Sequence, residues 1–275
     1  MNGQPTAPVI TLLTDFGLAD PSVGACRGVL TTIAPGVPLA DIGHEVPDFD
    51  IQAGARMLEY AVPYYPPGSI HVAVVDPGVG SARRGIAVRA RRGDLLVGPD
   101  NGLLLWAADR LGGVDQAVEL TSEEYRLHPT SHTFHARDVF CPAAGHLATG
   151  VALNRFGPRL DPRQLVRLPR QEPDVGDHEV RAAVSNISSF GNVHFDVLAD
   201  HWQSAGLEGE RNIQVIAGGR RWELPYALTF ADVPPGKALL LHDSFGRLCL
   251  AVNQGSAAAA FGLARGSEVR FTSLR

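Results

Sequence analysis

The sequence predicts two domains of different class: an α/β amino-terminal domain with a mainly parallel sheet, and a carboxyl-terminal antiparallel domain of β-barrel type. The chain has 275 residues, more than a usual single domain. Apolar runs alternate with helix-like segments as far as residue 149, whereas short β-prone runs fill the chain after residue 179. Between them, residues 159–179 carry three prolines and many charges, as a linker would. We therefore expect domains at 1–165 and 166–275.

The first half follows a strand–helix alternation. Residues 9–15 are an apolar run that ends in Asp15, as a buried strand would. Asp20 and Pro21 then supply an N-cap and a first-turn proline for a helix that reaches about residue 33. The later strands are expected at 37–42, 70–75, 86–89 and 95–97, and the later helices at 51–62, 103–111 and 139–149. Strands that alternate with helices predict parallel pairing.

The second half contains short runs of β-prone residues separated by Gly, Asn, Asp and Pro, a pattern typical of an antiparallel sandwich or barrel. These expected strands are residues 179–184, 193–198, 213–216, 222–228, 238–241, 247–252 and 268–271.

Composition excludes several classes of protein. Hydrophobic residues make up 45% and charged residues 19%, a globular balance that excludes disorder, collagen and coiled coil. The formal charge of 24 − 29 = −5 argues against nucleic acid as a partner. No run of 18 apolar residues is present, so no membrane span is expected.

Cysteine usage and the chain start predict a cytoplasmic protein. Cys26, Cys141 and Cys249 are widely separated and odd in number, which fits reduced thiols better than disulfides. No CxxC pair is present, which excludes a cysteine-rich zinc site. The first eight residues, MNGQPTAP, lack the basic and apolar regions of a secretory signal.

Polar residues follow two expected strands where a ligand would bind. Asp15 and Asp76 each end a buried run, and open parallel sheets bind ligands beyond the carboxyl ends of their strands. Each acid could instead only cap the next loop. The turn from Asp76 to Arg83 can bring the arginine back to the acid, and His135 would complete a polar group suited to proton transfer. A metal site is the alternative, but HTFHARD (132–138) lacks the spacing of known metal motifs.

Loops in the second half present aromatic and amide side chains. Phe190 and Asn192 surround a glycine turn, Phe230 lies in TFADVPPG, and NQG follows the expected strand at 247–252. Each segment could be only a hairpin turn. Together they would also suit the wall of a purine-binding site.

Seven motifs, taken in order, resemble the S-adenosylmethionine hydroxide adenosyltransferase (S-adenosylmethionine hydrolase) family, which is related to fluorinase and chlorinase. They are TDFG with a following DP, HEVPDFDIQAGA, VVDPGVGSARR, VGPDNGLL, TFHARDVF, SFGN and NQGSAA. The resemblance covers about residues 9–273. It implies an α/β domain followed by a barrel-like domain, and a homotrimer whose active sites lie between neighbouring subunits. The implied reaction is attack of water or hydroxide on the ribose C5′ of S-adenosylmethionine, giving adenosine and methionine, with no metal and no cofactor.

The resemblance also assigns site residues. The catalytic set of the family falls on Asp76, Arg83 and His135. Its ribose contact falls on Asp15 and a methionine-side contact on Ser22. The remaining substrate-binding positions line the adenosine or methionine pocket or lie in loops around the base: Phe49, Asn192, Phe230, Ser244, Asn253 and Ala258.

Two departures from the halogenases favour water as the nucleophile. Asp76 stands where the halogenases have tyrosine, and Ala136 stands where fluorinase has a halide-contacting serine. A carboxylate repels halide but accepts a proton from water. Asp243 also departs from the asparagine expected before SFG.

Three alternatives remain beside hydrolysis. They are a halogenase, a non-catalytic sensor of S-adenosylmethionine or adenosine, and a metal-dependent hydrolase that uses Asp15, His44, Asp76 and His135.

Overall fold

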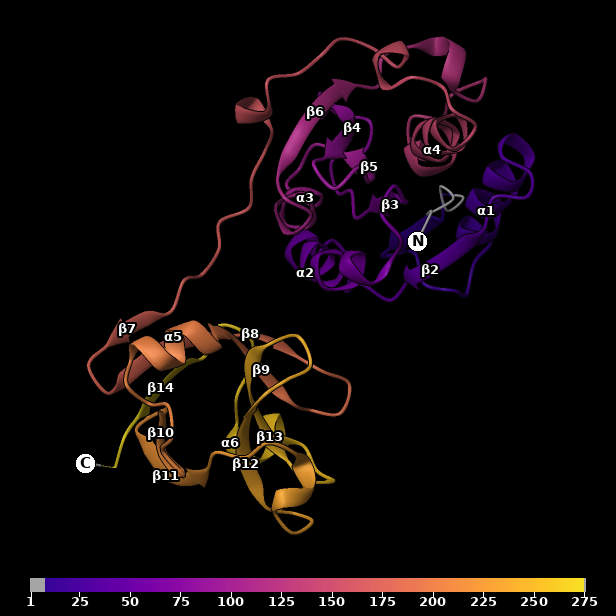
Figure 1. Ribbon diagram of the computed structural model, residues 1–275. Coiled ribbons are helices and arrows are strands. Elements are labelled where there is room, and N and C mark those ends of the chain that lie inside the picture. Colours follow the sequence, from indigo (N-terminus) through magenta and orange to yellow (C-terminus); the bar gives the residue numbers. More distant parts are fainter. Residues whose placement is uncertain (1–7, 275) are drawn as a thin grey trace, which may run out of the picture. The chain divides into compact units, whose positions relative to one another are not determined.

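The computed structural model describes residues 8–274, which form two compact units divided between residues 168 and 169 (Figure 1). Residues 1–8 were predicted to lack a secretory signal, and residues 1–7 of this segment lie outside the described range. Within the described range, no helix is both long and apolar enough to cross a membrane.

The first unit is built on a six-stranded sheet with the order β2-β1-β3-β5-β4-β6. Its strands are β1 (Ile10–Thr14), β2 (Leu39–Gly43), β3 (Ile70–Val74), β4 (Gly85–Ala90), β5 (Leu95–Pro99) and β6 (Val114–Glu119). Pairing is parallel from β2 to β5, whereas β4 is antiparallel to both β5 and β6. The predicted mainly parallel sheet is therefore confirmed.

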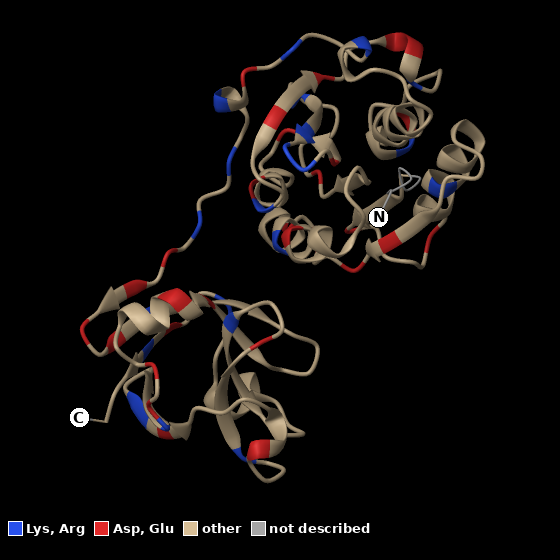
Figure 2. Ribbon diagram, in the orientation of Figure 1, with Lys and Arg blue, Asp and Glu red and all other residues tan. Residues whose placement is uncertain are grey.

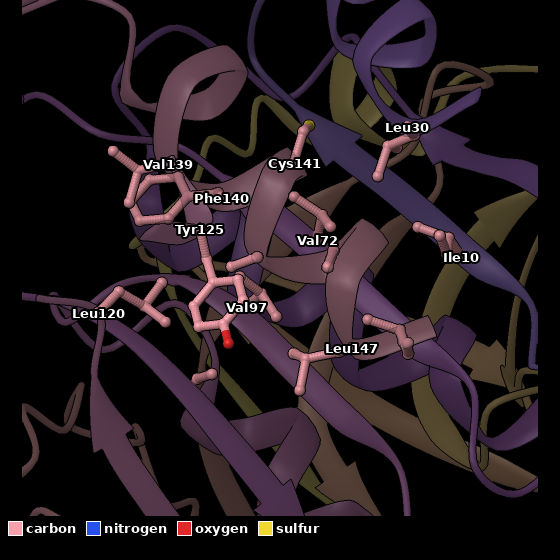
Figure 3. Close-up of a cluster of buried hydrophobic side chains, with 14 of the residues drawn as sticks. Ile10, Leu30, Val72, Val97, Leu120, Tyr125, Val139, Phe140, Cys141 and Leu147 are labelled. Carbon is pink, nitrogen blue, oxygen red and sulfur yellow. The ribbon is translucent and has the colours of Figure 1, made fainter. Parts of the chain in front are cut away.

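Helices cover both faces of this sheet (Figure 1). They are α1 (Ser22–Ile33) and α4 (Cys141–Ala148) on one face, and α2 (Ile51–Ala61) and α3 (Leu105–Arg110) on the other. Each face has its own apolar core because successive residues of a strand point to opposite sides. Figure 3 shows part of the first core, where Val72 and Val97 of the sheet meet Leu30 of α1 and Leu147 of α4.

Local capping explains where two helices begin. Asp20 was expected to be the N-cap of α1, but Pro21 occupies that position, and Asp20 Oδ1 accepts the N–H of Ser22 at 2.8 Å. Asp50 is the N-cap of α2, and its side chain accepts the N–H of Ala53 at 2.9 Å. Both carboxylates therefore satisfy N–H groups that a helix start leaves free.

Two elements of the first unit were not predicted. Strand β6 alternates too weakly to be found by its pattern because it lies at the sheet edge and carries polar residues. The helix expected at 139–149 is preceded by a π-helical turn, Ala136–Phe140, which continues into α4. Short 3₁₀ turns occur in the first unit at Val62–Tyr64, Glu123–Tyr125, Leu153–Arg155 and Pro162–Gln164, and in the second unit at Phe230–Asp232.

The second unit is an antiparallel, nearly closed barrel. Its strands are β7 (Asp174–Gly176), β8 (Glu179–Ile187), β9 (Val193–Leu198), β10 (Asn212–Ala217), β11 (Arg220–Pro225), β12 (Ala238–His242), β13 (Arg247–Val252) and β14 (Glu268–Thr272). The sheet runs β11-β10-β14-β8-β9-β13-β12, with β7 added to β8. A bridge from Tyr226 to Leu240 brings the two ends together. The predicted barrel-like class is confirmed, with two unpredicted short helices, α5 (Ala199–Ser204) and α6 (Ala257–Phe261).

Much of the predicted linker at 159–179 is not a free connection. Leu165 is buried in the core of the first unit, and Trp106 Nε1 donates to the Leu168 carbonyl at 3.3 Å. At the other end, β7 pairs with β8. Residues 169–173 join this part of the chain to β7 and contain one positive residue, Arg170, and one negative residue, Glu172. Figure 2 shows charged residues of both signs along the connecting segment. Leu165 and Leu168 explain why this part of the predicted linker packs against the first unit, because they bury apolar surface that a segment of charged residues alone would leave in water.

Candidate active site

Asp15 and Asp76 lie at the same edge of the first sheet. Strands β1 and β3 pair in parallel with Thr14 opposite Val74, so both acids follow the carboxyl ends of adjacent strands. A cleft of about 400 Å³ opens there. Its lining comes from the sheet edge and from two motif loops: Asp15, Phe16, Asp48, Phe49, Val74, Asp76, Val79, Thr133, Phe134, His135 and Ala136. The expectation that a ligand site forms beyond these strands therefore has a physical cavity to support it.

The turn after β3 folds Arg83 back onto Asp76. Arg83 Nε donates to Asp76 Oδ1 at 3.0 Å and Nη2 donates to Oδ2 at 2.5 Å, a two-pronged ion pair. Both side chains are nearly buried, at 8% and 6% exposed. Ser81 closes the turn because its hydroxyl donates to the Gly78 carbonyl at 2.7 Å. The carboxylate is thus fixed in orientation and shielded from water.

Gly80 allows this turn to contact the loop that carries His135. Its φ is +79°, and a Cβ at this position would lie 2.7 Å from the His132 carbonyl oxygen. Only glycine meets both requirements, since a side chain would be strained and would collide with the backbone. Two motifs that are far apart in the chain therefore pack directly against each other.

His135 stands at the start of the π-helical turn and contacts the same arginine. Its Nδ1 lies 3.1 Å from Arg83 Nη2. Arginine has no acceptor, so Nδ1 must accept this bond, and the neutral ring carries its proton on Nε2. The Arg83 guanidinium also lies 5.4 Å from the centre of the Phe140 ring. Asp76, Arg83 and His135 therefore form one connected set.

Burial shifts the pKa values of both titratable members of the set. Burial raises the pKa of Asp76 above its ordinary value of 3.8, although Arg83 acts in the opposite direction. Burial, followed by the charge of Arg83, lowers the pKa of His135 below its ordinary value of 6.5. Asp76 is thus a stronger base than an exposed aspartate, and His135 stays neutral near pH 7.

Of the other predicted residues of the first unit, Asp15 and Phe49 line the cleft, whereas Ser22 does not. Asp15 lines the cleft, and its Oδ2 accepts the N–H of Phe49 at 3.1 Å. Phe49 has φ +63°, unusual for an aromatic residue, and its side chain is 70% exposed at the cleft wall. Ser22 begins α1 and is not among the cleft-lining residues.

In the second unit, three of the predicted segments gather at one end of the β12–β13 hairpin. Asn253 Nδ2 donates to the Val233 carbonyl at 2.7 Å, which ties NQG to the segment of Phe230. Ala258 N donates to the Gly191 carbonyl at 2.9 Å, which ties it to the turn that carries Asn192. Ala258 was expected in a loop, but it lies in α6, whose start Ser256 caps. An Ala-rich segment after an N-cap serine favours this helix.

Ser244 does not join that group. It is exposed in the turn between β12 and β13, at the end of the hairpin opposite Asn253. The neighbouring Asp243 holds the turn: it accepts backbone N–H groups of Phe245 and Arg247 at 2.8 and 3.0 Å, and lies 2.9 Å from His194 Nδ1. These bonds outweigh burial and lower the pKa of Asp243. Aspartate at this position therefore has a structural role in the turn.

The four residues considered for a metal site do not form a ligand set. His44 is buried and directed elsewhere: its Nδ1 lies 2.9 Å from Thr14 Oγ1, and its Nε2 lies 3.1 Å from Asp41 Oδ1. Over residues 8–274, no three His, Cys, Asp or Glu side chains gather as a metal site would require.

Several cleft residues were not predicted individually. Phe16, Asp48 and Phe134 line the cleft, and each is adjacent to a predicted residue within TDFG, HEVPDFD or TFHARD, whereas Thr133 lies two residues before His135. The signal that could have found them is their position inside the three motifs that carry Asp15, Phe49 and His135. Asp138 has a different role, since it is buried and anchors the loop by accepting the N–H of Ser131 at 2.8 Å.

Comparisons with known proteins identify the family of the chain. Residues 10–157 match the family described as SAM hydroxide adenosyltransferase N-terminal domain, and residues 182–270 match the corresponding C-terminal domain. The chain is 45% identical over 267 residues to an (R)-S-adenosyl-L-methionine hydrolase of Salinispora arenicola, covering 97% of this chain and 98% of the relative. A fluorinase of Nocardia brasiliensis is 29% identical, with 96% of each chain covered.

A solved structure supports the same grouping. An uncharacterized conserved protein from Thermotoga maritima superposes with a TM-score of 0.90 at 32% identity, covering 96% of this chain and 99% of that chain. The resemblance inferred from the seven motifs is confirmed. The chain therefore belongs to the SAM hydroxide adenosyltransferase family.

Proposed function

We propose that this enzyme hydrolyses S-adenosyl-L-methionine by attack of water on the ribose C5′, giving adenosine and L-methionine. The observation that carries the proposal is the buried Asp76 carboxylate, which is fixed by Arg83 and has a pKa raised above its ordinary value. A base in this state can take a proton from a bound water molecule.

The charge of the cleft supports a cationic substrate. Asp15 and Asp48 line it together with Asp76, whereas the positive charge of Arg83 is already paired with Asp76. S-adenosylmethionine carries a sulfonium, and acidic side chains around a cleft raise the local concentration of a cation. An aromatic side chain at the wall, Phe49, can pack against an apolar part of such a ligand.

The chemical step needs a positioned nucleophile more than an acid. The C5′–O bond forms as the C5′–S bond breaks, and the sulfonium leaves as a neutral thioether. Asp76 accepts one proton from the attacking water and orients it along the line of the breaking bond. The water is partly removed from bulk solvent, which strengthens its interaction with the carboxylate.

Arg83 and His135 have distinct tasks in this step. Arg83 holds Asp76 through two bonds and stabilises the hydroxide character that develops on the water. His135 accepts from Arg83 at Nδ1, so its Nε2–H is the group that can donate a hydrogen bond to the reacting oxygen. We assign orientation to His135 and proton acceptance to Asp76.

Residues of the second unit complete the proposed site in a homotrimer. We propose that Asn192, Phe230, Ser244, Asn253 and Ala258 of one subunit bind the substrate held by Asp15, Ser22, Phe49 and Asp76 of its neighbour. The family resemblance supports this arrangement. We also place the enzyme in the cytoplasm, since its three cysteines are free thiols, as is usual in a reducing compartment.

Two alternatives are disfavoured by specific features. A halogenase would have to bring an anion next to the Asp76 carboxylate, and the buried Ala136 offers no hydroxyl to hold it. A non-catalytic sensor would not require the connected Asp76–Arg83–His135 set, which costs free energy to bury.

Product analysis tests the proposed function. In ¹⁸O-water we expect adenosine and methionine in equal amounts, with one labelled oxygen in adenosine, measured by mass spectrometry. Label in methionine or a halogenated nucleoside at high chloride would overturn the proposal, and binding without any product would favour the sensor. Because the Salinispora relative is named for the (R) form, the assay uses both sulfonium epimers. We expect the (R) form to be consumed, since inversion at sulfur moves the methionyl arm out of its place.

Metal removal is expected to leave the rate unchanged. The proposed mechanism assigns base, orientation and charge stabilisation to side chains, and no ligand cluster was found among residues 8–274. Turnover measured after exhaustive treatment with EDTA should equal that of the untreated enzyme. A loss of turnover that one divalent ion restores would contradict this expectation.

Activity should fall on the acid side because Asp76 must be ionised. Burial raises the pKa of Asp76 above its ordinary value of 3.8, so Asp76 gains a proton at a higher pH than an exposed aspartate would. Burial lowers the pKa of His135 below 6.5, so its ring becomes protonated at a lower pH than an exposed histidine would. A His135→Gln enzyme should be slower, but its kcat should still decrease as the pH is lowered, because Asp76 still titrates. If kcat of His135→Gln no longer decreased at low pH, the titrating base would be His135 instead.

A further inference from the structure

A second hollow adjoins the catalytic set and is lined by Arg83 and His135. It has a volume of about 250 Å³, and we call it the rear hollow. Its lining comes from the Arg83 turn, the end of β6, and the loop and π-helical turn around His135: Ser81, Ala82, Arg83, Arg84, Gly85, Glu119, Leu120, Thr121, Arg126, His135 and Val139.

The cleft and the rear hollow share His135 in their linings. Asp76 lines the cleft and not the rear hollow, Arg83 lines the rear hollow and not the cleft, and His135 lines both. Since Arg83 bonds to both Asp76 and His135, three connected side chains join the linings of the two spaces.

The chemistry of the rear hollow suits water. Ser81, Glu119, Thr121 and Arg126 supply hydrogen-bonding groups, and Ser81 and Thr121 are exposed, so the hollow opens to solvent. Its apolar floor is Leu120 and Val139, which Figure 3 shows within the first core.

Arg126 is held in place beside this space and acts on His135. Its Nη1 donates to Glu123 Oε1 at 2.7 Å, and its Nη2 donates to the Leu120 carbonyl. After burial and Arg83, its positive charge contributes to lowering the pKa of His135. His135, the residue that both spaces share, thus stays neutral near pH 7.

We propose that the rear hollow is the solvent port of the active site. Solvent in the rear hollow exchanges with the cleft beside His135, which lines both spaces: water enters there, and the proton that Asp76 accepts leaves there, while substrate closes the cleft. This inference rests on the proposed function, in which each turnover consumes one water, forms one C5′–O bond, breaks one C5′–S bond and releases one proton. A filled cleft cannot exchange either species with solvent at its front.

Thr121 offers a way to plug the port without touching the set. It is exposed, and its N–H donates to the Glu119 and Phe156 carbonyls, bonds that a side-chain change preserves. Ser122 is the matched control, because its N–H also donates to the Phe156 carbonyl at 2.9 Å but it does not line the rear hollow.

The test measures kcat for hydrolysis, the Kd for S-adenosylmethionine and Tm. For Thr121→Phe we expect kcat to fall roughly tenfold or more with unchanged Kd, while Ser122→Phe and Thr121→Ala keep wild-type values. If Thr121→Phe has a lowered Tm, the smaller Thr121→Leu replaces it.

If folded Thr121→Phe or Thr121→Leu has a kcat within twofold of that of Ser122→Phe, the proposal that the rear hollow is a solvent port is wrong. A loss of kcat matched by an equal loss of substrate affinity would also overturn it. Failure of the proposed function is distinguishable from both, because the wild-type enzyme would then form no adenosine.

Discussion

An Arg83→Ala enzyme is expected to turn over about 10²–10³ times more slowly than the wild type while its affinity for S-adenosylmethionine changes little. Arg83 makes two bonds to Asp76 and one to His135, so its loss frees both groups from their orientation. These interactions matter most as charge develops on the attacking water, and so kcat should fall more than Kd rises. Steady-state kinetics and calorimetric titration with substrate measure the two quantities.

Two companion variants make the Arg83 result specific. Arg27 pairs with Asp41 at the surface and lines neither the cleft nor the rear hollow, so Arg27→Ala should keep wild-type kcat. Asp76→Asn should be at least as slow as Arg83→Ala, because the amide cannot accept the proton. A near-normal kcat in either Arg83→Ala or Asp76→Asn would remove that residue from the mechanism.

Two inactive variants are expected to restore activity to each other when they assemble together. Asp76→Ala removes the base in the first unit, and Asn192→Ala removes a proposed substrate contact in the second. In a trimer with sites shared by neighbours, every mixed trimer has both halves intact at one of its three sites, so about one third of the sites should be active. Hydrolysis by co-expressed, doubly tagged and tandem-purified oligomers measures this gain.

The control for this experiment is a pair of lesions on the same side of the site. Asp76→Ala and Arg83→Ala both alter the first unit, so no mixed interface should be repaired. Mixed Asp76→Ala and Asn192→Ala oligomers that are no more active than either parent would contradict a shared site. Their mass, measured by light scattering, checks the proposed trimer independently.

The sequence predicted that Asp15 and Asp76 lie together at one edge of the sheet, because each follows a strong local signal. Asp15 and Asp76 end two continuous apolar runs, and a parallel sheet necessarily places such residues at one edge. The Asp76–Arg83 pair was also predictable, since a turn with two glycines brings the two residues together. Local patterns of this kind need no knowledge of distant parts of the chain.

Features that depend on distant contacts were not predictable in the same way. The bond from Arg83 to His135 depends on the turn around Gly80 packing against the carbonyl of His132. The end of the first unit depends on Leu165 and Leu168 finding its core, which outweighs the charges around them. Strand β6 takes its conformation from β4 beside it and not from its own alternation.

The π-helical turn before α4 has a consequence for how the sequence can vary. The Cys141 N–H donates to the carbonyl of Ala136, five residues earlier, so this turn holds one residue more than an α-turn. Deleting one residue between 136 and 140 would restore the regular helix and rotate His135 by about 100° relative to α4. The ring would then face away from Arg83. Chain length in this segment is therefore under a constraint as strict as the identity of the histidine, whereas exposed turns elsewhere tolerate insertions and deletions.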